Sequence, residues 1–525
     1  MLFFTLSSIK NRKFLASTLT LTSIVLTSLI LSSCELGTGA SDRIIANYHL
    51  LDPCEKSDDV NFIDNALCGV ISVPENRYSR DGRQIDLNIM LLPATSAVVL
   101  SDPIFFLAGG PGQSAVDAGP GLFSRLGEMR TERDIILVDQ RGTGNSNSLS
   151  CELNISTIES MSLSVEEFET RQTEKLKSCL EEYDADPSLY TTPNAMDDLN
   201  EVREKLGYEK INLYGISYGT RAALVYLRRH ESTVRSMIID SVVPLTMTIP
   251  KNVALDAQSS FALLLEDCKS QPGCHEAFPD LHNHLRELVQ RLQDSPEDVS
   301  VLHPRTGIMM TGPFDPVLIG RVIRSILYNR TLSRLLPLAI EEAWAGNYQP
   351  LSTLGYAFTG DEDELGMSMG MMASVLCSED MTLISEPNHT DDFDNAIYRT
   401  LKPVCEFWPK GDIPQSYFDA VESDVPVLIT SGELDPITPP KYGTEAALTL
   451  SNSRHLIVAG VGHAASVNGC LPKLMSTFLE DVDPANLDAT CADKLKRLPF
   501  FTSYAGALSP MVTDAPRSIE EKQND

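Results

Sequence analysis

The sequence has few basic residues for its length and lacks the cysteine spacing of a metal or redox motif. Its 525 residues include 42 lysines and arginines but 72 aspartates and glutamates, which gives a formal net charge of −30 at pH 7. Proteins that bind nucleic acid need basic surfaces, so this balance argues against that class of partner. None of the 11 cysteines belongs to a C-x-x-C pair, which argues against zinc and redox sites of that type. Internal repeats and low-complexity linkers are also lacking.

The amino-terminal stretch has the pattern of an export signal. Basic residues at positions 10, 12 and 13 precede the apolar run 14–31, which is short for a stable membrane span. The run ends in Leu-Ser-Ser before Cys34, an order typical of a bacterial lipoprotein signal. We predict that residues 1–33 are removed and that Cys34 is lipidated. The chain would then be extracytoplasmic, held on the periplasmic or cell-surface side of a bacterial membrane by its acyl anchor alone. An uncleaved anchor and an ordinary secreted protein are the alternatives.

The cysteines other than Cys34 form an even set, which in an exported chain suggests disulfide bonds. The sequence does not fix their connectivity, and free buried thiols are the alternative. Neighbours in chain order would form local loops: Cys54 with Cys68, Cys151 with Cys179, Cys268 with Cys274, Cys377 with Cys405, and Cys470 with Cys491.

The most specific chemical signal is the pentapeptide 215–219, Gly-Ile-Ser-Tyr-Gly. It follows the apolar run 210–214 and leads into the helix-forming stretch 220–227, so the sequence predicts a strand, a sharp turn and a helix. Such a turn holds a serine out of the backbone and exposes it to a base, while the glycines let strand and helix approach closely. Ser217 is therefore the candidate nucleophile.

A base and an acid with suitable settings follow the serine in the chain. Of the 9 histidines, His463 lies on a loop after the apolar run 455–459, and an imidazole accepts and returns a proton near neutral pH. Two aspartates, Asp435 and Asp240, end strand-like runs and are candidates to orient it. We favour Asp435, because a serine, an acid and a histidine in that order are typical of hydrolases with this turn. The alternative role of Asp240 is to cap or anchor a loop.

The loop Gly109–Gly112 follows another apolar run, 103–108, directly. Its position predicts that it supplies one backbone N–H to an oxyanion, and the N–H of Tyr218 would supply the other. Pro111 has no N–H, so the donor in the loop is expected to be Gly109 or Gly110. A phosphate site is excluded because the loop lacks the Lys-Ser/Thr of a P-loop.

Together these segments resemble the proline iminopeptidase and tripeptidyl aminopeptidase branch of the α/β-hydrolase superfamily. The resemblance covers most of residues 65–500 and rests on segments 109–112, 139–146, 215–220, 431–439 and 462–463. Ala108 stands where many iminopeptidases have a histidine, which favours the larger, secreted tripeptidyl-type enzymes. The resemblance implies hydrolysis of peptides from a free amino end, without a metal or cofactor.

Recognition of a free α-ammonium group calls for an acidic residue. In the segment 373–380, the order cysteine, small polar residue, acid resembles the amine-binding segment of the tripeptidyl-type enzymes. Glu379 is the first candidate and Asp380 the second, because a carboxylate gains a charge-assisted hydrogen bond from an ammonium group in a dehydrated pocket. The alternative is that both acids are surface residues at a helix end.

The resemblance also implies the fold, an α/β-hydrolase with a mostly parallel, eight-stranded sheet and flanking helices. We expect the hydrolase core at residues 60–243 and 425–500, and a large, mainly helical cap at 244–424 over the carboxyl ends of the strands, where parallel sheets bind ligands. Residues 501–525 are expected to form a tail. The methionine-rich run 366–372 is expected to be ordinary core packing, with pocket lining as the alternative.

The sequence thus predicts an exported serine hydrolase, an aminopeptidase of tripeptidyl or prolyl type that forms an acyl-enzyme on Ser217. Its partner would be a peptide with a free N-terminal amine. A carboxylesterase or lipase, and a non-catalytic binding lipoprotein on the same fold, are the alternatives.

Overall fold

The computed structural model describes residues 48–55, 65–79, 82–151, 163–295, 297–358, 367–386, 388, 390, 393 and 395–507. The chain divides into the unit Met1–Arg43 and the main unit Ile44–Asp525, and every described residue belongs to the main unit. The predicted signal 1–33, Cys34 and most of the predicted tail lie outside the described residues. Within the described ranges, no helix combines the length and the apolar character needed to cross a membrane.

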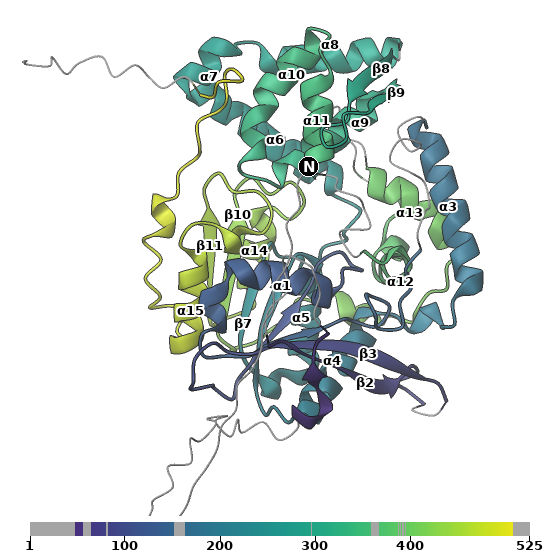
Figure 1. Ribbon diagram of the computed structural model, residues 1–525, viewed down its shortest axis with the longest axis vertical. Helices are drawn as coiled ribbons and strands as arrows, with labels where there is room; N and C mark the ends of the chain where they lie inside the picture. Colours follow the sequence, from purple (N-terminus) through teal and green to yellow (C-terminus); the bar gives the residue numbers. More distant parts are fainter. Residues whose placement is uncertain are drawn as a thin grey trace, which may run out of the picture. The chain divides into compact units, whose positions relative to one another are not determined.

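The main sheet has nine strands, in the order β1-β2-β3-β5-β4-β6-β7-β10-β11. Figure 1 labels β2, β3, β7, β10 and β11 of this sheet. The strands are β1 (Asp52–Pro53), β2 (Leu67–Pro74), β3 (Gln84–Leu92), β4 (Ile104–Leu107), β5 (Ile135–Val138), β6 (Ile211–Ile216), β7 (Val234–Asp240), β10 (Val427–Gly432) and β11 (Ser453–Val458). Strands β1, β2, β3 and β5 pair antiparallel, and the other pairings are parallel. The mostly parallel sheet is confirmed. The strand beyond the expected eight is β1, which pairs with Leu67 and Cys68.

Both faces of this sheet are covered, and its strands β4 and β5 are continuous apolar runs. Strands β4, β5 and β10 are buried at every position, as is typical of parallel sheets between helices. Side chains alternate along a strand, so Leu213 belongs to one apolar core and Tyr214 to the other. The first core includes residues of α4 (Thr192–Leu206), α5 (Tyr218–His230) and α14 (Pro440–Ala447), and the second includes residues of α1 (Ala115–Arg125) and α15 (Leu471–Asp481).

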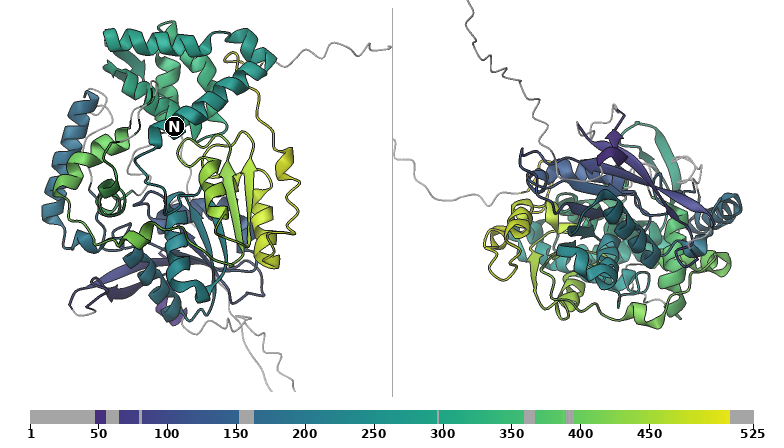
Figure 2. Two further views of the ribbon diagram at one scale, coloured as in Figure 1. Left: turned by 180° about the vertical axis from the view of Figure 1, so that it is seen from behind. Right: turned by 90° about the horizontal axis from the view of Figure 1, so that it is seen from below.

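The chain between β7 and β10, which contains the cap predicted at 244–424, carries eight α-helices and one hairpin in its described residues. These are α6 (Val253–Ser270), α7 (Pro272–Ala277), α8 (Leu281–Asp294), β8 (Glu297–Leu302), β9 (Met309–Phe314), α9 (Pro316–Leu327), α10 (Leu336–Trp344), α11 (Gln349–Phe358), α12 (Met369–Glu379) and α13 (Ala396–Phe407). Helices α6–α11 share an apolar core of their own and lie together in both Figure 1 and Figure 2. In contrast, α12 and α13 contribute to a core of the sheet and pack against α3 (Val165–Glu182).

Disulfide bonds join all the cysteine pairs predicted from chain order. They are Cys54–Cys68, Cys151–Cys179, Cys268–Cys274, Cys377–Cys405 and Cys470–Cys491. The Cys377–Cys405 bond connects α12 to α13, and Cys470 is the residue that precedes α15. The alternative of free buried thiols is therefore wrong for these cysteines.

The disulfides are expected to stabilise the fold measurably. A bond restricts the unfolded chain, so replacing both Cys151 and Cys179 by alanine should lower the free energy of unfolding by about 2–4 kcal/mol. Urea denaturation of the two proteins without reductant measures this difference. Titration of the denatured wild type with a thiol reagent should detect none of the bonded cysteines, and detection of several would contradict the pairing.

Candidate active site

The candidate nucleophile occupies a strained turn between β6 and α5. Ser217 has φ 58° and ψ −127°, a backbone conformation that costs free energy outside glycine and that clusters at functional sites. A Cβ atom at Gly219 would overlap the carbonyl oxygen of Leu107, and one at Gly215 would overlap that of Gly219. Only glycine therefore fits on either side of the serine. The predicted strand, turn and helix are all present.

The loop after β4 lies against this serine. A Cβ atom at Gly109 would be 3.4 Å from the Cβ atom of Ser217. The Gly109 N–H donates to Oε1 of Gln113 at 3.2 Å, whereas Gly110 is exposed and has a φ of +107°. Tyr218 is the first residue of α5, where a backbone N–H has no acceptor within the helix. The N–H groups of Gly110 and Tyr218 are thus better placed than that of Gly109 to bind an oxyanion.

Asp139 fixes the far end of this loop, a role that the sequence motif 139–146 did not reveal. Its Oδ1 accepts hydrogen bonds from Ser114 Oγ at 2.7 Å and from Val116 N at 3.0 Å, and its Oδ2 accepts one from Asn145 N at 3.2 Å. Ser114, two residues after Gly112, also caps α1. Burial raises the pKa of Asp139, and these donors oppose the rise. Asp139 therefore positions the loop.

Asp435 and His463 meet in the interior of the site. Nδ1 of His463 lies 2.9 Å from Oδ2 of Asp435, whose other oxygen accepts the N–H groups of Ile437 and Thr438 at 3.0 and 2.9 Å. Burial alone would raise the pKa of Asp435, but His463 and these donors lower it. Burial alone would lower the pKa of His463, but the charge of Asp435 raises it. Asp435 can therefore orient the imidazole ring of His463 and stabilise its protonated form.

Asp240, the alternative acid, binds the backbone of the loop that follows β11 and contains His463, here called the histidine loop. It forms no hydrogen bond with the His463 ring in the part of the chain that the structure describes. Its carboxylate accepts the N–H groups of Ala465 and Ser466 at 3.0 and 2.8 Å, and its carbonyl oxygen accepts the N–H of Ser217 at 3.0 Å. In the described residues the ring of His463 forms hydrogen bonds through Nδ1 only, so none joins Nε2 to Ser217. Catalytic hydrogen bonds are often long before substrate binds. Asp240 thus connects the serine turn to the histidine loop.

Tyr328, which follows α9, packs against the candidate base and was not identified from the sequence. Its ring centroid lies 4.8 Å from that of His463, and its carbonyl oxygen accepts the N–H of His463 at 3.2 Å. A Cβ atom at Gly462 would overlap the carbonyl oxygen of Leu327. Gly462, directly before His463, therefore lets the segment that contains Tyr328 approach closely. The sequence alone could not assign this role to the glycine, because it does not show that the two segments meet.

Both predicted amine-binding residues are buried, so the alternative that they are surface residues is wrong. Glu379 is 0% exposed. Its Oε1 accepts the N–H of Thr192 at 2.7 Å, and its Oε2 accepts the hydroxyl groups of Thr192 and Tyr417. The Thr192 hydroxyl also lies 2.6 Å from that of Tyr218. Burial raises the pKa of Glu379 to about 7.

Asp380 has a different environment from that of its neighbour. It forms a buried ion pair with Arg221 at 2.8 Å and accepts the N–H of Ile249 at 2.8 Å. Because the guanidinium group neutralises this carboxylate, Asp380 is less suited than Glu379 to receive an ammonium group.

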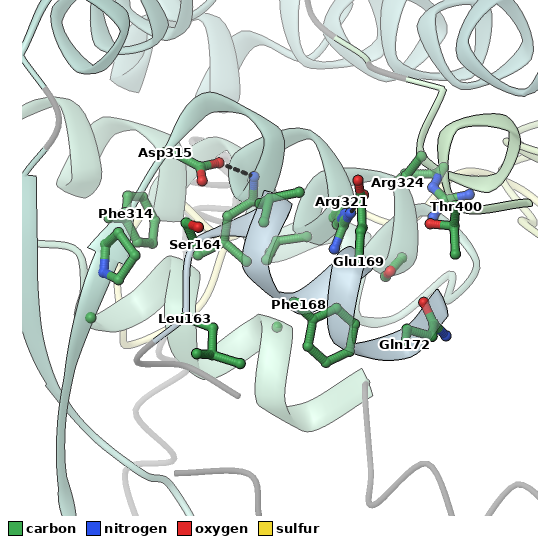
Figure 3. Close-up of a pocket in the computed structure, with 18 of the residues that line it drawn as sticks. Leu163, Ser164, Phe168, Glu169, Gln172, Phe314, Asp315, Arg321, Arg324 and Thr400 are labelled. Atoms are coloured by element: carbon green, nitrogen blue, oxygen red, sulfur yellow. Dashed lines mark hydrogen bonds and ion pairs between the residues drawn. The ribbon is translucent and has the colours of Figure 1, made fainter. Parts of the chain in front are cut away.

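A cavity of about 520 Å³ lies between α3, α9, α11, α12, α13 and the β8–β9 hairpin (Figure 3). Ser217, Asp435 and His463 do not line it. Met369 and Met372 do, whereas Met371 is fully buried in a core of the sheet. The methionine-rich run therefore contributes both to core packing and to the lining of a pocket. Among the residues that the structure describes, no group of His, Cys, Asp and Glu side chains is arranged to hold a metal ion.

Comparison with protein families defines the class. Residues 102–275 match the family described as alpha/beta hydrolase fold, and residues 390–491 match the family described as TAP-like protein. With the parallel sheet and the serine turn between β6 and α5, these matches show that the chain is a serine hydrolase with the α/β-hydrolase fold.

Several relatives of this chain are named as peptidases. Serine protease Hip1 of Mycobacterium tuberculosis H37Rv is 24% identical over 81% of this chain and 88% of the relative. The tripeptidyl aminopeptidase of Streptomyces coelicolor is 29% identical over 45% of each chain. Among solved structures, the proline iminopeptidase of Mycobacterium smegmatis covers 79% of this chain and 99% of its own, at 14% identity and a TM-score of 0.37. The predicted resemblance to the proline iminopeptidase and tripeptidyl aminopeptidase branch is confirmed by the sequence relatives.

The pH dependence of activity can assign the acid. An imidazole must be neutral to accept a proton, so activity should rise as pH passes the pKa of His463, which Asp435 raises. Asp435→Asn is expected to shift this rise to lower pH and, by analogy with other serine hydrolases, to reduce turnover by about 10⁴-fold. The profile of kcat/KM against pH measures both effects.

The matched control for this experiment is Asp240→Asn. Asp240 hydrogen-bonds the backbone of the histidine loop and not the ring, so we expect a smaller displacement of the profile. A larger displacement for Asp240→Asn than for Asp435→Asn would reverse the assignment.

Proposed function

We propose that the chain is an exported aminopeptidase that cleaves peptides from their free amino end through an acyl-enzyme on Ser217. The observation that carries this proposal is the 2.9 Å contact between His463 and the buried Asp435. The loop that contains His463 also shares Asp240 with the turn at Ser217. The names of the relatives, serine protease, tripeptidyl aminopeptidase and proline iminopeptidase, support a peptide as the substrate.

The proposed mechanism is acyl transfer. Ser217 Oγ attacks the scissile carbonyl carbon while His463 Nε2 takes the hydroxyl proton. The N–H groups of Gly110 and Tyr218 stabilise the oxyanion, and loss of one such donor costs about 3 kcal/mol of transition-state stabilisation. His463 then gives its proton to the leaving amine. Water repeats the cycle and releases the acyl group, while Asp435 holds the imidazole in the required tautomer.

Glu379 is the proposed partner of the substrate's α-ammonium group. Its pKa of about 7 reflects the cost of burying a charge, and a neighbouring ammonium group would stabilise the ionised carboxylate. The hydroxyl groups of Thr192 and Tyr218 link this carboxylate to the residue whose N–H is a proposed oxyanion donor. Amine recognition and the reacting carbonyl would thus lie on one connected network.

Export is supported by the disulfide bonds, because such bonds persist in oxidising compartments. Removal of residues 1–33 and lipidation of Cys34 are the finer part of this proposal. They rest on the basic and apolar pattern that precedes Cys34.

A substrate panel tests the proposed activity. It consists of aminoacyl, dipeptidyl and tripeptidyl chromogenic amides, each with a free and an acetylated amino end, together with a p-nitrophenyl ester. We expect cleavage of the free-amine amides, little cleavage of the acetylated ones, and a loss of turnover of about 10⁴ to 10⁶ in Ser217→Ala.

Each alternative function predicts a different result in this panel. Equal cleavage of free and acetylated amides would refute an aminopeptidase. Preferential cleavage of the ester would favour an esterase or lipase, and the absence of any turnover would favour a binding lipoprotein.

Glu379→Gln tests the amine-binding role separately, because it keeps the side-chain shape and removes the charge. We expect the ratio of kcat/KM for a free amide to that for its acetylated form to fall toward one. Tyr417→Phe removes only a donor to the same carboxylate and should preserve the ratio. If Glu379→Gln lowered activity toward both substrates by the same factor, the residue would have a structural role only.

A further inference from the structure

The cavity between the insertion and α3 has apolar walls and a size that suits a small ligand. Its volume of about 520 Å³ falls within the range of about 300–1,000 Å³ that is usual for ligand pockets. Apolar side chains that line it include Leu163, Phe168, Val299, Phe314, Leu318 and Ile397. These walls suit the backbone and apolar side chains of a short peptide segment.

The acids in this cavity already have partners. Glu169 forms ion pairs with Arg321 at 2.8 Å and with Arg399 at 2.6 Å. Asp315 caps α9 by accepting the N–H of Leu318 at 2.8 Å. Neither carboxylate is therefore available to a cationic ligand without the loss of an existing contact.

Arg324 is the contrasting group. It lines the cavity, where Figure 3 shows it at the end opposite Phe314. It is partly exposed, and it forms no hydrogen bond or ion pair in the described part of the chain. A guanidinium group carries five N–H donors and stays charged at any physiological pH. In a chain with a net charge of −30, this cation is an unused binding group for an anion.

The cavity borders the candidate active site through two elements. On α9, Arg324 and Ser325 line the cavity, and Tyr328, one turn further along the chain, contacts His463. On α12, Met369 lines the cavity. The preceding residue, Ser368, donates its N–H to Gly112 O at 2.8 Å, in the loop Gly109–Gly112 that is the proposed oxyanion loop. A peptide held at Ser217 would therefore have this cavity beside it.

We propose that the cavity binds a carboxylate group of the peptide substrate and that Arg324 is its partner. Arginine pairs with a carboxylate through two parallel hydrogen bonds, which gives both affinity and orientation. This inference rests on the proposed function, since it takes a peptide as the ligand. The carboxylate is either an acidic side chain or the peptide's own carboxyl terminus. The amino end of the substrate binds elsewhere, because Arg324 repels an ammonium group.

Calorimetric titration of the Ser217→Ala protein with three matched pentapeptides tests the proposal. All have a free amino end: one is neutral with an amidated carboxyl end, one has a free carboxyl end, and one is amidated with glutamate in place of a glutamine. At least one of the two acidic peptides is expected to bind about tenfold more tightly than the neutral one. The peptide that gains affinity identifies the source of the carboxylate.

Arg324→Gln in the same background should abolish this difference, and Arg324→Lys should keep part of it. The matched control is Arg125→Gln, which removes an equal charge from an exposed position on α1, away from the cavity lining. Equal affinity for all three peptides would overturn the proposal. So would a difference that survives Arg324→Gln, or one that Arg125→Gln reduces equally.

Binding is the readout, so failure of this inference can be told from failure of the proposed function. If the protein with Ser217 intact cleaves neutral free-amine peptides while the three affinities are equal, only the role of Arg324 is refuted. If it cleaves no peptide, the aminopeptidase proposal is refuted, and the affinities still decide whether Arg324 binds a carboxylate.

Discussion

The buried residue Asp240 determines how the proposed catalytic groups are held together. Its carbonyl oxygen accepts the N–H of Ser217. Its carboxylate accepts the N–H groups of Ala465 and Ser466, which follow His463 by two and three residues. Strand β7, which Asp240 ends, lies between β6 and β10 in the sheet. The hydrogen-bonded backbone of adjacent strands therefore sets the distance between the serine turn and the histidine loop. The proposed catalytic side chains lose no conformational entropy in fixing that distance.

The insertion between β7 and β10 also contributes contacts to this site. Tyr328 packs on His463, and Ser368 donates its N–H to Gly112 in the proposed oxyanion loop. Helices α6–α11 have an apolar core independent of the sheet. They can therefore form a rigid surface beside the reacting groups. The helices that lead to these two contacts, α9 and α12, also line the cavity that contains Arg324. Recognition of substrate beyond the scissile bond would thus depend on the insertion, and the chemistry on the sheet.

The features that could be predicted from the sequence are those carried by neighbouring residues. The turn at Ser217 is such a case, because its strand, glycines and helix are contiguous, and the disulfides pair cysteines that are close in the chain. Among contacts between distant segments, the pair of Asp435 and His463 could be predicted from the order of the motifs along the chain. The roles of Asp139 and Tyr328 and the proposed role of Arg324 could not, because no motif marks the segments that they contact. The hairpin β8–β9 was missed because it lies within a mainly helical stretch and most of its residues are not fully buried. Glu379 ends α12 as its place at a helix end suggested, but only the packing of Thr192 and Tyr417 shows that it is buried.

The most direct test of the central claim is covalent labelling with a fluorophosphonate, followed by mass spectrometry of the digested protein. A hydroxyl group reacts with this probe only when a nearby base activates it. We predict one label per chain, on the peptide that contains Ser217, at a rate that falls sharply in His463→Ala. A folded chain that takes up no label, or that carries it on another residue, would contradict the proposed catalytic site.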